Sequence, residues 1–335
     1  MAKRIPKHLN ILKNNFYCLY DKILNHPHEI KIELTYDCNR NCDFCFNKNS
    51  KKDNYLAFED IDKLITKIRE EGIHRVRFTG GEPLKRTDIK KILRLTHKKG
   101  LYIKLNTNGD LLTNENLKAI SNYCMEVLLP LHDKKDITNE FYKKIKVLKK
   151  KGLMVYISTI AIRKNIEDFS HFSDFIIKAN PDLWFWNYPI PTKKELITWQ
   201  DVQKLIKKIQ THPTKTKAIR FPLCKVPRKN IDRDIQGCKN CGPYDHLVVS
   251  PSGEVHICNS FQNKLGTLDD SLLKIWRENS IVQRFKTHKI LPQECQKCKL
   301  LKKCYGGCRY SAYLHTKKLG AKHPLMKDSE NKTSK

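Results

Sequence analysis

The chain has 335 residues, of which 39% are hydrophobic and 30% are charged, a balance typical of a folded globular protein. Its 65 Lys and Arg outnumber its 35 Asp and Glu, which gives a formal net charge of +30. No apolar run approaches the roughly 18 residues of a membrane-spanning helix, and the basic N-terminus lacks the apolar segment of a secretory signal. These features exclude a largely disordered chain, and we expect a cytoplasmic protein with no membrane partner.

The positive charge is compatible with anionic partners such as nucleic acid, phosphates or acidic peptides. The lysines are, however, spread along the exposed faces of several predicted helices, as in 143–151. A lysine-rich proteome would produce the same charge. The sequence shows no clear set of aromatic stacking positions that an RNA would need, so nucleic acid stays an alternative partner and is not the expected one.

Strand-like and helix-like segments alternate from residue 30 onward, which predicts a parallel sheet with crossover helices. Residues 1–29 precede them as an extension that we expect to be helical near 16–24. The amphipathic helices are marked by apolar residues at helical spacing, such as Ile61, Leu64 and Ile68. In such arrays the chemistry gathers at the carboxyl ends of the strands. The predicted strands are 30–36, 75–79, 101–106, 126–131, 153–160 and 183–189.

Three cysteines follow the first predicted strand, in Cys38-Asn-Arg-Asn-Cys42-Asp-Phe-Cys45. Thiolates at this spacing can share a four-iron cluster and leave one iron open, or they can bind zinc. No fourth ligand is close in sequence, since the next histidine is His74 and the next cysteine is Cys124. The motif resembles that of radical S-adenosylmethionine (radical SAM) enzymes. This resemblance implies that the open iron chelates the amino and carboxylate groups of S-adenosylmethionine (AdoMet).

The segment after the second strand, Phe78-Thr-Gly80-Gly81-Glu82-Pro83, resembles the Gly-Gly-Glu-Pro segment of the same family. By this resemblance Gly80, Gly81, Glu82 and Pro83 bind the cofactor. Glycines allow backbone to approach a ligand closely, and Glu82 can accept a hydrogen bond from the AdoMet ammonium. On its own the segment would also suit an ordinary turn.

Three further strand ends carry candidate AdoMet contacts. Asn108 lies in Asn106-Thr-Asn-Gly109, which is similar to a turn of the family, although an ordinary Asn-Gly turn is an equal alternative. Pro130 stands where relatives often place a serine on the ribose, so that contact is lost or moved, with His132 or Asp133 as alternatives. Ser158 on the fifth strand matches a hydroxyl residue that contacts AdoMet in relatives.

The second half contains a second set of cysteines. A helix is expected over 201–210, a looser segment over 211–217 and a strand over 246–250. The run Cys295-x2-Cys298-x5-Cys304-x3-Cys308 could hold a structural zinc by itself. Together with Cys238, Cys241, Gly253 and Cys258, it resembles the SPASM extension of radical SAM enzymes, which holds auxiliary iron–sulfur clusters.

The SPASM resemblance implies one or two auxiliary [4Fe–4S] clusters. By its pattern an inner cluster is held by Cys238, Cys241, Cys258 and Cys308, and an outer cluster takes three ligands from Cys295, Cys298 and Cys304. The last cysteine that the pattern expects after Cys308 is absent. The alternatives are an open iron or a replacement by His315, His323, Met326, Asp328 or the upstream Cys224.

These features predict an α/β fold class with five segments. They are an N-terminal extension (1–29), a partial six-stranded (βα)6 TIM-like barrel of parallel strands (30–195), a connecting segment (196–237), a small cysteine-rich α+β SPASM-type domain (238–312) and a basic tail (313–335).

The family resemblance implies an enzyme, a radical SAM oxidoreductase or maturase. Such enzymes reductively cleave AdoMet at a [4Fe–4S] cluster to a 5′-deoxyadenosyl radical, which abstracts a hydrogen atom from the substrate. We expect oxidation or cross-linking of a peptide or protein residue, with a reductant such as flavodoxin or ferredoxin as partner. The enzyme alternative acts on a small molecule or an RNA nucleoside, and the non-enzyme alternative is a zinc-stapled basic binding module. The sequence identifies no catalytic residue and no specific substrate.

Overall fold

The computed structural model describes residues 25–48, 50, 55–189, 197–238, 241–261 and 263–326. The chain divides into two compact units, each assembled from separate stretches of sequence. The first unit comprises 1–130, 138–156 and 245–283, and the second comprises 131–137, 157–244 and 284–335. The expected helix near 16–24 lies outside the described residues.

The first unit contains a sheet in the order β10-β9-β8-β1-β2-β3-β4. Neighbouring strands from β8 to β4 run parallel, whereas β8, β9 and β10 pair antiparallel. The strands are β1 (Glu29–Glu33), β2 (Arg75–Thr79), β3 (Tyr102–Asn106), β4 (Glu126–Pro130), β8 (His246–Val249), β9 (Glu254–His256) and β10 (Lys264–Thr267).

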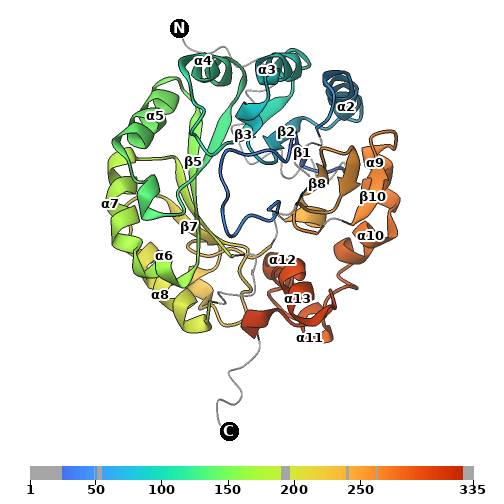
Figure 1. The fold of residues 1–335 in the computed structure, drawn as a ribbon. Helices are drawn as coiled ribbons and strands as arrows, with labels where there is room; N and C mark the ends of the chain where they lie inside the picture. Colours follow the sequence, from blue (N-terminus) through green and yellow to red (C-terminus); the bar gives the residue numbers. More distant parts are fainter. Residues whose placement is uncertain are drawn as a thin grey trace. The chain divides into compact units, whose positions relative to one another are not determined.

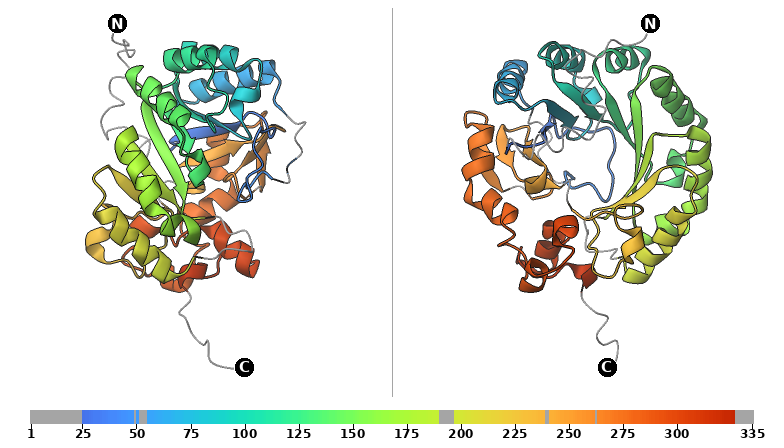
Figure 2. Two further views of the ribbon diagram at one scale, coloured as in Figure 1. Left: turned by 60° about the vertical axis from the view of Figure 1, so that its left-hand side comes forward. Right: turned by 180° about the vertical axis from the view of Figure 1, so that it is seen from behind.

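Amphipathic helices cover one face of this sheet. Figures 1 and 2 show α2, α3 and α4 side by side along the strands. In α2 the buried residues Ile61, Leu64, Ile65 and Ile68 form the predicted apolar stripe. The helices of this unit are α2 (Phe58–Glu70), α3 (Ile89–Lys98), α4 (Asn114–Tyr123), α5 (Asn139–Lys150) and α9 (Leu272–Glu278), and α10 (Ser280–Lys286) begins in it.

The strands of the first unit alternate between fully buried apolar residues and charged residues. Side chains two residues apart share one face of a strand, so Ile30, Ile32, Val76 and Phe78 form the apolar core. On the other face Glu29 forms ion pairs with Arg77 at 3.0 Å and with Lys104 at 3.3 Å. Opposite charges on neighbouring strands therefore compensate one another on a polar sheet face.

Buried His246 and half-buried His28 extend this polar face. Glu29 stands in register with His246 on β8, and these two side chains and Asp245 have ligand atoms within 4.8 Å of one another. This group is not a metal site of the usual kind, because Glu29 is already paired with Arg77 and Lys104. Burial lowers the pKa of His246 to about 4, and burial likewise lowers the pKa of His28 to about 4.

We expect the protein to lose stability as the pH falls from 6.5 toward 4. In that range the unfolded state binds protons at these histidines and the folded state does not, so the free energy of unfolding decreases with decreasing pH. For His246 the loss is about 2 kcal/mol between pH 7.5 and 5. Anaerobic unfolding by denaturant at both pH values measures it, and His246→Gln should reduce the difference. An equal pH dependence in this variant would contradict the assignment.

The second unit has an aromatic core. Its strand β6 pairs parallel with β7, and Trp184 and Trp186 on β6 are fully buried against Phe169, with Trp186 stacked on Phe169 at 5.4 Å between ring centroids. The elements are β6 (Leu183–Asn187), β7 (Thr216–Ile219), α6 (Arg163–Glu167), α7 (Phe169–Ala179), α8 (Trp199–Gln210), α11 (Gln293–Gln296), α12 (Leu301–Cys304) and α13 (Arg309–Thr316). The strand β5 (Met154–Ile160) begins in the first unit and ends in the second.

The fold prediction is confirmed, with corrections at the ends of elements. All six predicted strands are present as β1 to β6, but β1 ends at Glu33, three residues earlier than expected. The segment 211–217, predicted to be loose, instead leads into β7 at Thr216, a strand of four residues that is too short for a periodic signal. No helix in the described part of the chain is long and apolar enough to cross a membrane.

Candidate metal centres

The first three cysteines lie together on the irregular loop after β1. Each of Cys38, Cys42 and Cys45 is partly exposed. The Cys45 N–H donates to the Cys42 carbonyl at 3.1 Å, and the Arg40 N–H donates to the Cys38 Sγ at 3.4 Å. Burial raises the pKa of Cys45, and the neighbouring Cys38 raises it further. The loop therefore places the three cysteines on one partly exposed segment that follows β1.

The positions of the cysteine sulfur atoms bear on the choice between a cluster and a single zinc ion. Zinc–sulfur bonds of about 2.3 Å in a tetrahedron bring sulfur atoms to about 3.8 Å from one another. Among the described residues, the one group of three ligating side chains within 4.8 Å contains no cysteine. As placed, no three cysteine sulfur atoms of the described residues meet this criterion, so the cysteines do not form a closed zinc site in this structure.

The Gly-Gly-Glu segment docks against the cysteine loop. The Gly81 N–H donates to the Thr35 carbonyl at 2.7 Å, and the Glu82 N–H donates to the Asp37 carbonyl at 2.8 Å. A Cβ on Gly80 would lie 2.3 Å from the Thr35 carbonyl oxygen, and one on Gly81 would lie 2.1 Å from that of Asp37. The close approach at both glycines is therefore to the backbone that carries the cysteines.

Glu82 is fully buried and joins two strand ends. Its carboxylate accepts hydrogen bonds from the Leu84 N–H at 2.9 Å, the Thr107 hydroxyl at 2.7 Å and the Asn108 N–H at 2.7 Å. Burial raises the pKa of Glu82, although these three donors oppose the shift. Pro83 directly follows it and begins the short helix η2 (Pro83–Lys85). The AdoMet contacts of Glu82 and Pro83 stay predictions.

The turn after β3 supports the cysteine loop from another side. The Asn108 Nδ2 donates to the Asn39 Oδ1 at 2.7 Å and approaches the Cys38 Sγ at 3.8 Å. Arg40 pairs with Asp110 through two hydrogen bonds of 2.8 and 2.6 Å, which lower the pKa of Asp110. Asn39, Arg40 and Asp110 were not predicted from the sequence, because their partners lie about 70 positions away and leave no local pattern.

A buried carboxylate connects the end of β1 with the segment of Cys258. The Glu33 Oε1 accepts hydrogen bonds from the Asn259 Nδ2 at 2.6 Å and from the Asn47 Nδ2 at 3.5 Å. Burial raises the pKa of Glu33. Asn259 directly follows Cys258, whose Sγ accepts the Phe261 N–H at 3.2 Å. Within the first unit, this auxiliary cysteine is thus anchored to the strand that leads into the first cysteine loop.

The candidate ribose contacts lie at two successive strands: His132 and Asp133 follow β4, and Ser158 lies on β5. Pro130 ends β4. In the second unit, buried Ser158 accepts a hydrogen bond at its Oγ from the Asn187 Nδ2 at 2.6 Å. The Asp133 carboxylate caps the helix η3 (Lys134–Asp136), and the backbone N–H of His132 donates to Asp136 at 3.2 Å. The contacts of Ser158, His132 and Asp133 with AdoMet stay predictions.

Three predicted ligands of the inner cluster occur together in the second unit. Cys238 and Cys241 hydrogen bond through their thiols, and Cys308 acts on Cys238 electrostatically. The Cys241 contact is the largest cause of a raised pKa at Cys238, and burial raises this pKa further. Cys258 belongs to the other unit.

The cysteines predicted for the outer cluster also share one region of this unit. Cys295 lies in α11, and Cys304 ends α12. The Leu300 N–H donates to the Cys298 Sγ at 3.4 Å, and the Leu223 N–H donates to the Cys304 Sγ at 3.3 Å. Amide donors to sulfur stabilise the thiolate form that iron–sulfur clusters require. The donor sets of both cysteine regions therefore fit iron–sulfur ligation.

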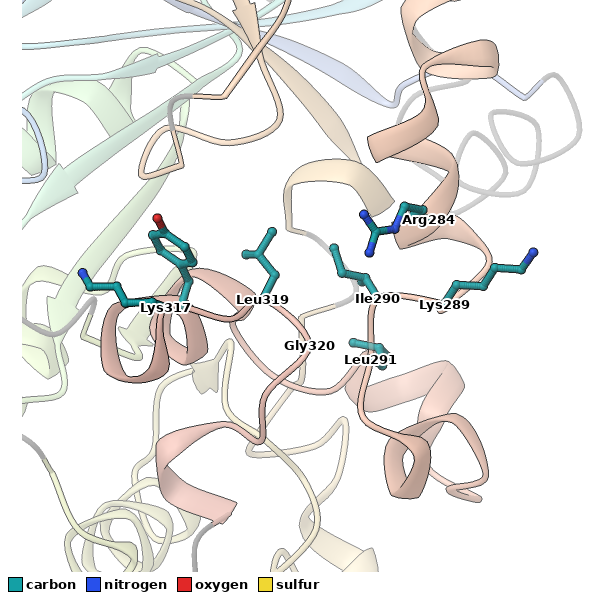
Figure 3. Close-up of a pocket in the computed structure, with 8 residues that line it drawn as sticks. Arg284, Lys289, Ile290, Leu291, Lys317, Leu319 and Gly320 are labelled. Carbon is teal, nitrogen blue, oxygen red and sulfur yellow. The ribbon is translucent and has the colours of Figure 1, made fainter.

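A basic cavity of about 350 Å³ lies elsewhere in the second unit (Figure 3). Arg284, Lys289 and Lys317 stand around it, and aliphatic side chains such as Ile290 and Leu319 complete its lining. Its lining includes no cysteine and none of the residues predicted to bind AdoMet. It is therefore a separate feature, suited by charge to an anionic group.

Family models and solved structures agree with these features. The Radical SAM superfamily model matches residues 32–176, and a model described as SPASM, iron–sulfur cluster-binding domain, matches 238–299. SuiB of Streptococcus suis bound to S-adenosylmethionine has a TM-score of 0.71 and 17% identity, covering 95% of this chain and 82% of that one. The SuiB complex with precursor peptide SuiA has a TM-score of 0.68 and 17% identity, covering 94% and 80%.

A second similar structure is anSMEcpe with bound AdoMet and the Cp18Cys peptide. It has a TM-score of 0.67 and 19% identity, covering 85% of this chain and 89% of that one. At these identities the structures show a common fold. The two family models show that the chain belongs to the radical SAM superfamily and has a SPASM domain, which implies an enzyme with a [4Fe–4S] cluster, AdoMet and auxiliary clusters.

Proposed function

We propose that this enzyme oxidises or cross-links a residue of a peptide or protein. One observation carries the proposal. The chain combines a radical SAM domain with a SPASM domain, and its fold matches at least 80% of the length of two proteins that are solved with a bound peptide. SuiB is solved with its precursor peptide SuiA, and anSMEcpe with the Cp18Cys peptide. A small molecule or RNA nucleoside is the second candidate substrate, and the formal net charge of +30 is compatible with an anionic one.

In this proposal Cys38, Cys42 and Cys45 hold the cluster that binds AdoMet. When bound, this group supplies the electron that cleaves AdoMet to methionine and a 5′-deoxyadenosyl radical, and the auxiliary clusters offer an acceptor for the electron that the substrate loses. The contacts of Gly81 and Asn108 with the loop position it. Radical chemistry requires such fixed placement, because the protein's task is orientation and exclusion of side reactions.

The remaining predicted contacts have defined parts in the proposal. Gly80, Gly81, Glu82 and Pro83 would line the AdoMet site next to the cysteine loop, and Asn108 would contribute to it from the turn after β3. The Glu82 carboxylate would favour the AdoMet ammonium electrostatically, because opposite charges attract strongly at a buried position. Ser158 would donate to or accept from the ribose. A flavodoxin or ferredoxin would supply the electron.

The first test is AdoMet cleavage by the reconstituted enzyme. We expect 5′-deoxyadenosine after anaerobic reconstitution with iron and sulfide and addition of AdoMet and dithionite. The Cys38→Ala, Cys42→Ala, Cys45→Ala triple variant should form none, since three-cysteine ligation is lost. Chromatographic quantification of the nucleoside measures both. An iron-loaded wild type without product in the presence of peptide, RNA and metabolite fractions would contradict the radical reaction.

The substrate class is tested by the same assay with fractionated extracts. A peptide substrate should raise 5′-deoxyadenosine formation and lose two hydrogen atoms, visible by mass spectrometry of the peptide. Deuterium transfer from labelled peptide into 5′-deoxyadenosine would identify the abstracted hydrogen. Stimulation by a metabolite or RNA fraction alone, with no peptide changed in mass, would replace the peptide proposal by the second candidate.

A further inference from the structure

We propose that Cys224 is the fourth cysteine ligand of the outer auxiliary cluster, together with Cys295, Cys298 and Cys304. This assignment places the missing ligand upstream of the array, whereas the sequence pattern expects it downstream of Cys308. It does not depend on the substrate, and it settles whether the outer cluster has an iron open to other molecules.

Cys224 lies next to the cysteines of the outer cluster. The Cys224 thiol forms a hydrogen bond with the Cys304 sulfur, and Cys295 and Cys298 are near enough to act on Cys224 electrostatically. The preceding residue, Leu223, donates its N–H to the same Cys304 Sγ at 3.3 Å. Cys224 therefore contacts one of the cysteines that the pattern assigns to the outer cluster and lies near the other two.

The segment that carries Cys224 is fixed by its neighbours. Phe221 and Leu223 are fully buried, and the Phe221 N–H donates to the Gln236 carbonyl at 3.1 Å. The Val226 N–H donates to the Leu223 carbonyl at 3.1 Å, which closes a turn around Cys224. Cys224 itself is exposed, so this turn presents a thiol without burying it. A rigid turn ending in a thiol is the arrangement that a cluster ligand needs.

The surrounding charge fits an anionic group at this site. Arg309 is 5% exposed and forms no ion pair with a carboxylate among the described residues. Its guanidinium donates to the carbonyls of Gly306, Gly307, Leu319 and Ala321 and acts on Cys295 electrostatically. A buried cation without a counter-ion is costly. Four thiolates around a cluster would supply the missing negative charge.

The residues downstream of Cys308 are less suitable than Cys224 as the fourth ligand of the outer cluster. The His323 Nδ1 accepts a hydrogen bond from the Leu325 N–H at 3.2 Å. The proton of the neutral imidazole is therefore on Nε2, and a protonated Nε2 cannot bind iron. The groups that act on His323 are Arg309 and His315, and no cysteine is among them. His315 is exposed on α13, and Met326 ends the short helix η6 (Pro324–Met326). Asp328 lies outside the described residues.

Ligation by Cys224 has a chemical consequence. Its thiol would release a proton and bind iron as thiolate, giving the four-cysteine ligation of a complete [4Fe–4S] cluster. Such a cluster has no iron open to a substrate atom. The outer cluster would then carry electrons and would not bind the substrate.

Alkylation of the wild-type protein tests the assignment without a variant. Cys224 is exposed, but its hydrogen bond with Cys304 and its partial burial raise the pKa of the thiol, so alkylation is run with excess iodoacetamide at alkaline pH. Cys224 should then be modified in the cluster-free protein and unmodified in the anaerobically reconstituted protein. Peptide mass spectrometry measures the modified fraction, and buried Cys124 is the internal control that is unmodified in both folded states. Equal modification of Cys224 with and without clusters would overturn the proposal.

A variant test uses the Cys38→Ala, Cys42→Ala, Cys45→Ala background, in which only auxiliary clusters bind. Adding Cys224→Ala should remove about four iron atoms per chain or convert one cluster to a [3Fe–4S] form detectable by electron paramagnetic resonance. Met326→Ala is the matched control and should leave iron, sulfide and spectra unchanged. Full iron content and an unaltered spectrum in the Cys224→Ala chain would contradict the proposal, as would cluster loss confined to Met326→Ala.

Discussion

Replacement of Gly81 by alanine is expected to abolish AdoMet cleavage as completely as the loss of a cysteine ligand. The added Cβ would lie 2.1 Å from the Asp37 carbonyl oxygen and 2.6 Å from its carbonyl carbon. Cβ atoms essentially never approach backbone this closely, and neither partner is a flexible side chain. The cysteine loop must therefore move away from the Gly-Gly-Glu segment.

The movement would break the hydrogen bonds that place the loop. The Gly81 N–H donates to Thr35 and the Glu82 N–H donates to Asp37, directly before Cys38. A displacement of about 1 Å at a reacting centre can reduce a rate by about 100-fold, and a larger one should prevent cluster binding. We expect 5′-deoxyadenosine formation to fall at least about 100-fold, with loss of the iron bound at the first site.

A matched control separates this collision from a general effect of replacing glycine. A Cβ added at Gly72 would have no atom within 4 Å, although the φ of +75° at this residue disfavours alanine. Gly72→Ala should therefore cost about 1 to 2 kcal/mol of stability and keep normal iron content and AdoMet cleavage. If Gly81→Ala retained wild-type activity, the cysteine loop would not depend on the contact between Gly81 and Asp37.

The alternation of apolar segments was enough to predict the parallel-strand fold. Each strand from β1 to β6 carries a short run with buried apolar residues, and a helix with an apolar stripe separates most of them. The strand β7 escaped prediction because its four residues acquire their conformation from pairing with β6. The burial of charged Glu29 also could not be predicted, because its ion pairs with Arg77 and Lys104 join three different strands.

The sequence predicts a part of the candidate site when all residues of that part lie in one short motif. Cys38, Cys42 and Cys45 stand within eight consecutive residues, so spacing alone predicts that they bind one cluster together. Contacts between distant segments left no such signal: Glu33 meets Asn259 across 226 positions. Cys224 likewise reaches Cys304 through tertiary structure, which is why the sequence left it as one alternative among several.

Glu82→Gln is expected to reduce AdoMet cleavage by about 10- to 100-fold while the fold persists. The carboxylate now accepts three protein hydrogen bonds, from Leu84, Thr107 and Asn108. A glutamine side chain has a single oxygen, so at least one of these buried donors loses its acceptor. An unsatisfied buried donor costs about 1 to 3 kcal/mol, and the turn that holds Asn108 near Cys38 would shift.

The substitution also removes the negative charge proposed for the AdoMet ammonium, and a comparison separates the two effects. Thr107→Val removes one donor to Glu82 but keeps the carboxylate and therefore its charge. If Glu82 binds AdoMet, Glu82→Gln should raise the AdoMet dissociation constant in anaerobic calorimetry, whereas Thr107→Val should change it only a few-fold. Equal weakening by both variants, with equal loss of iron, would show that Glu82 acts only by positioning the turn after β3.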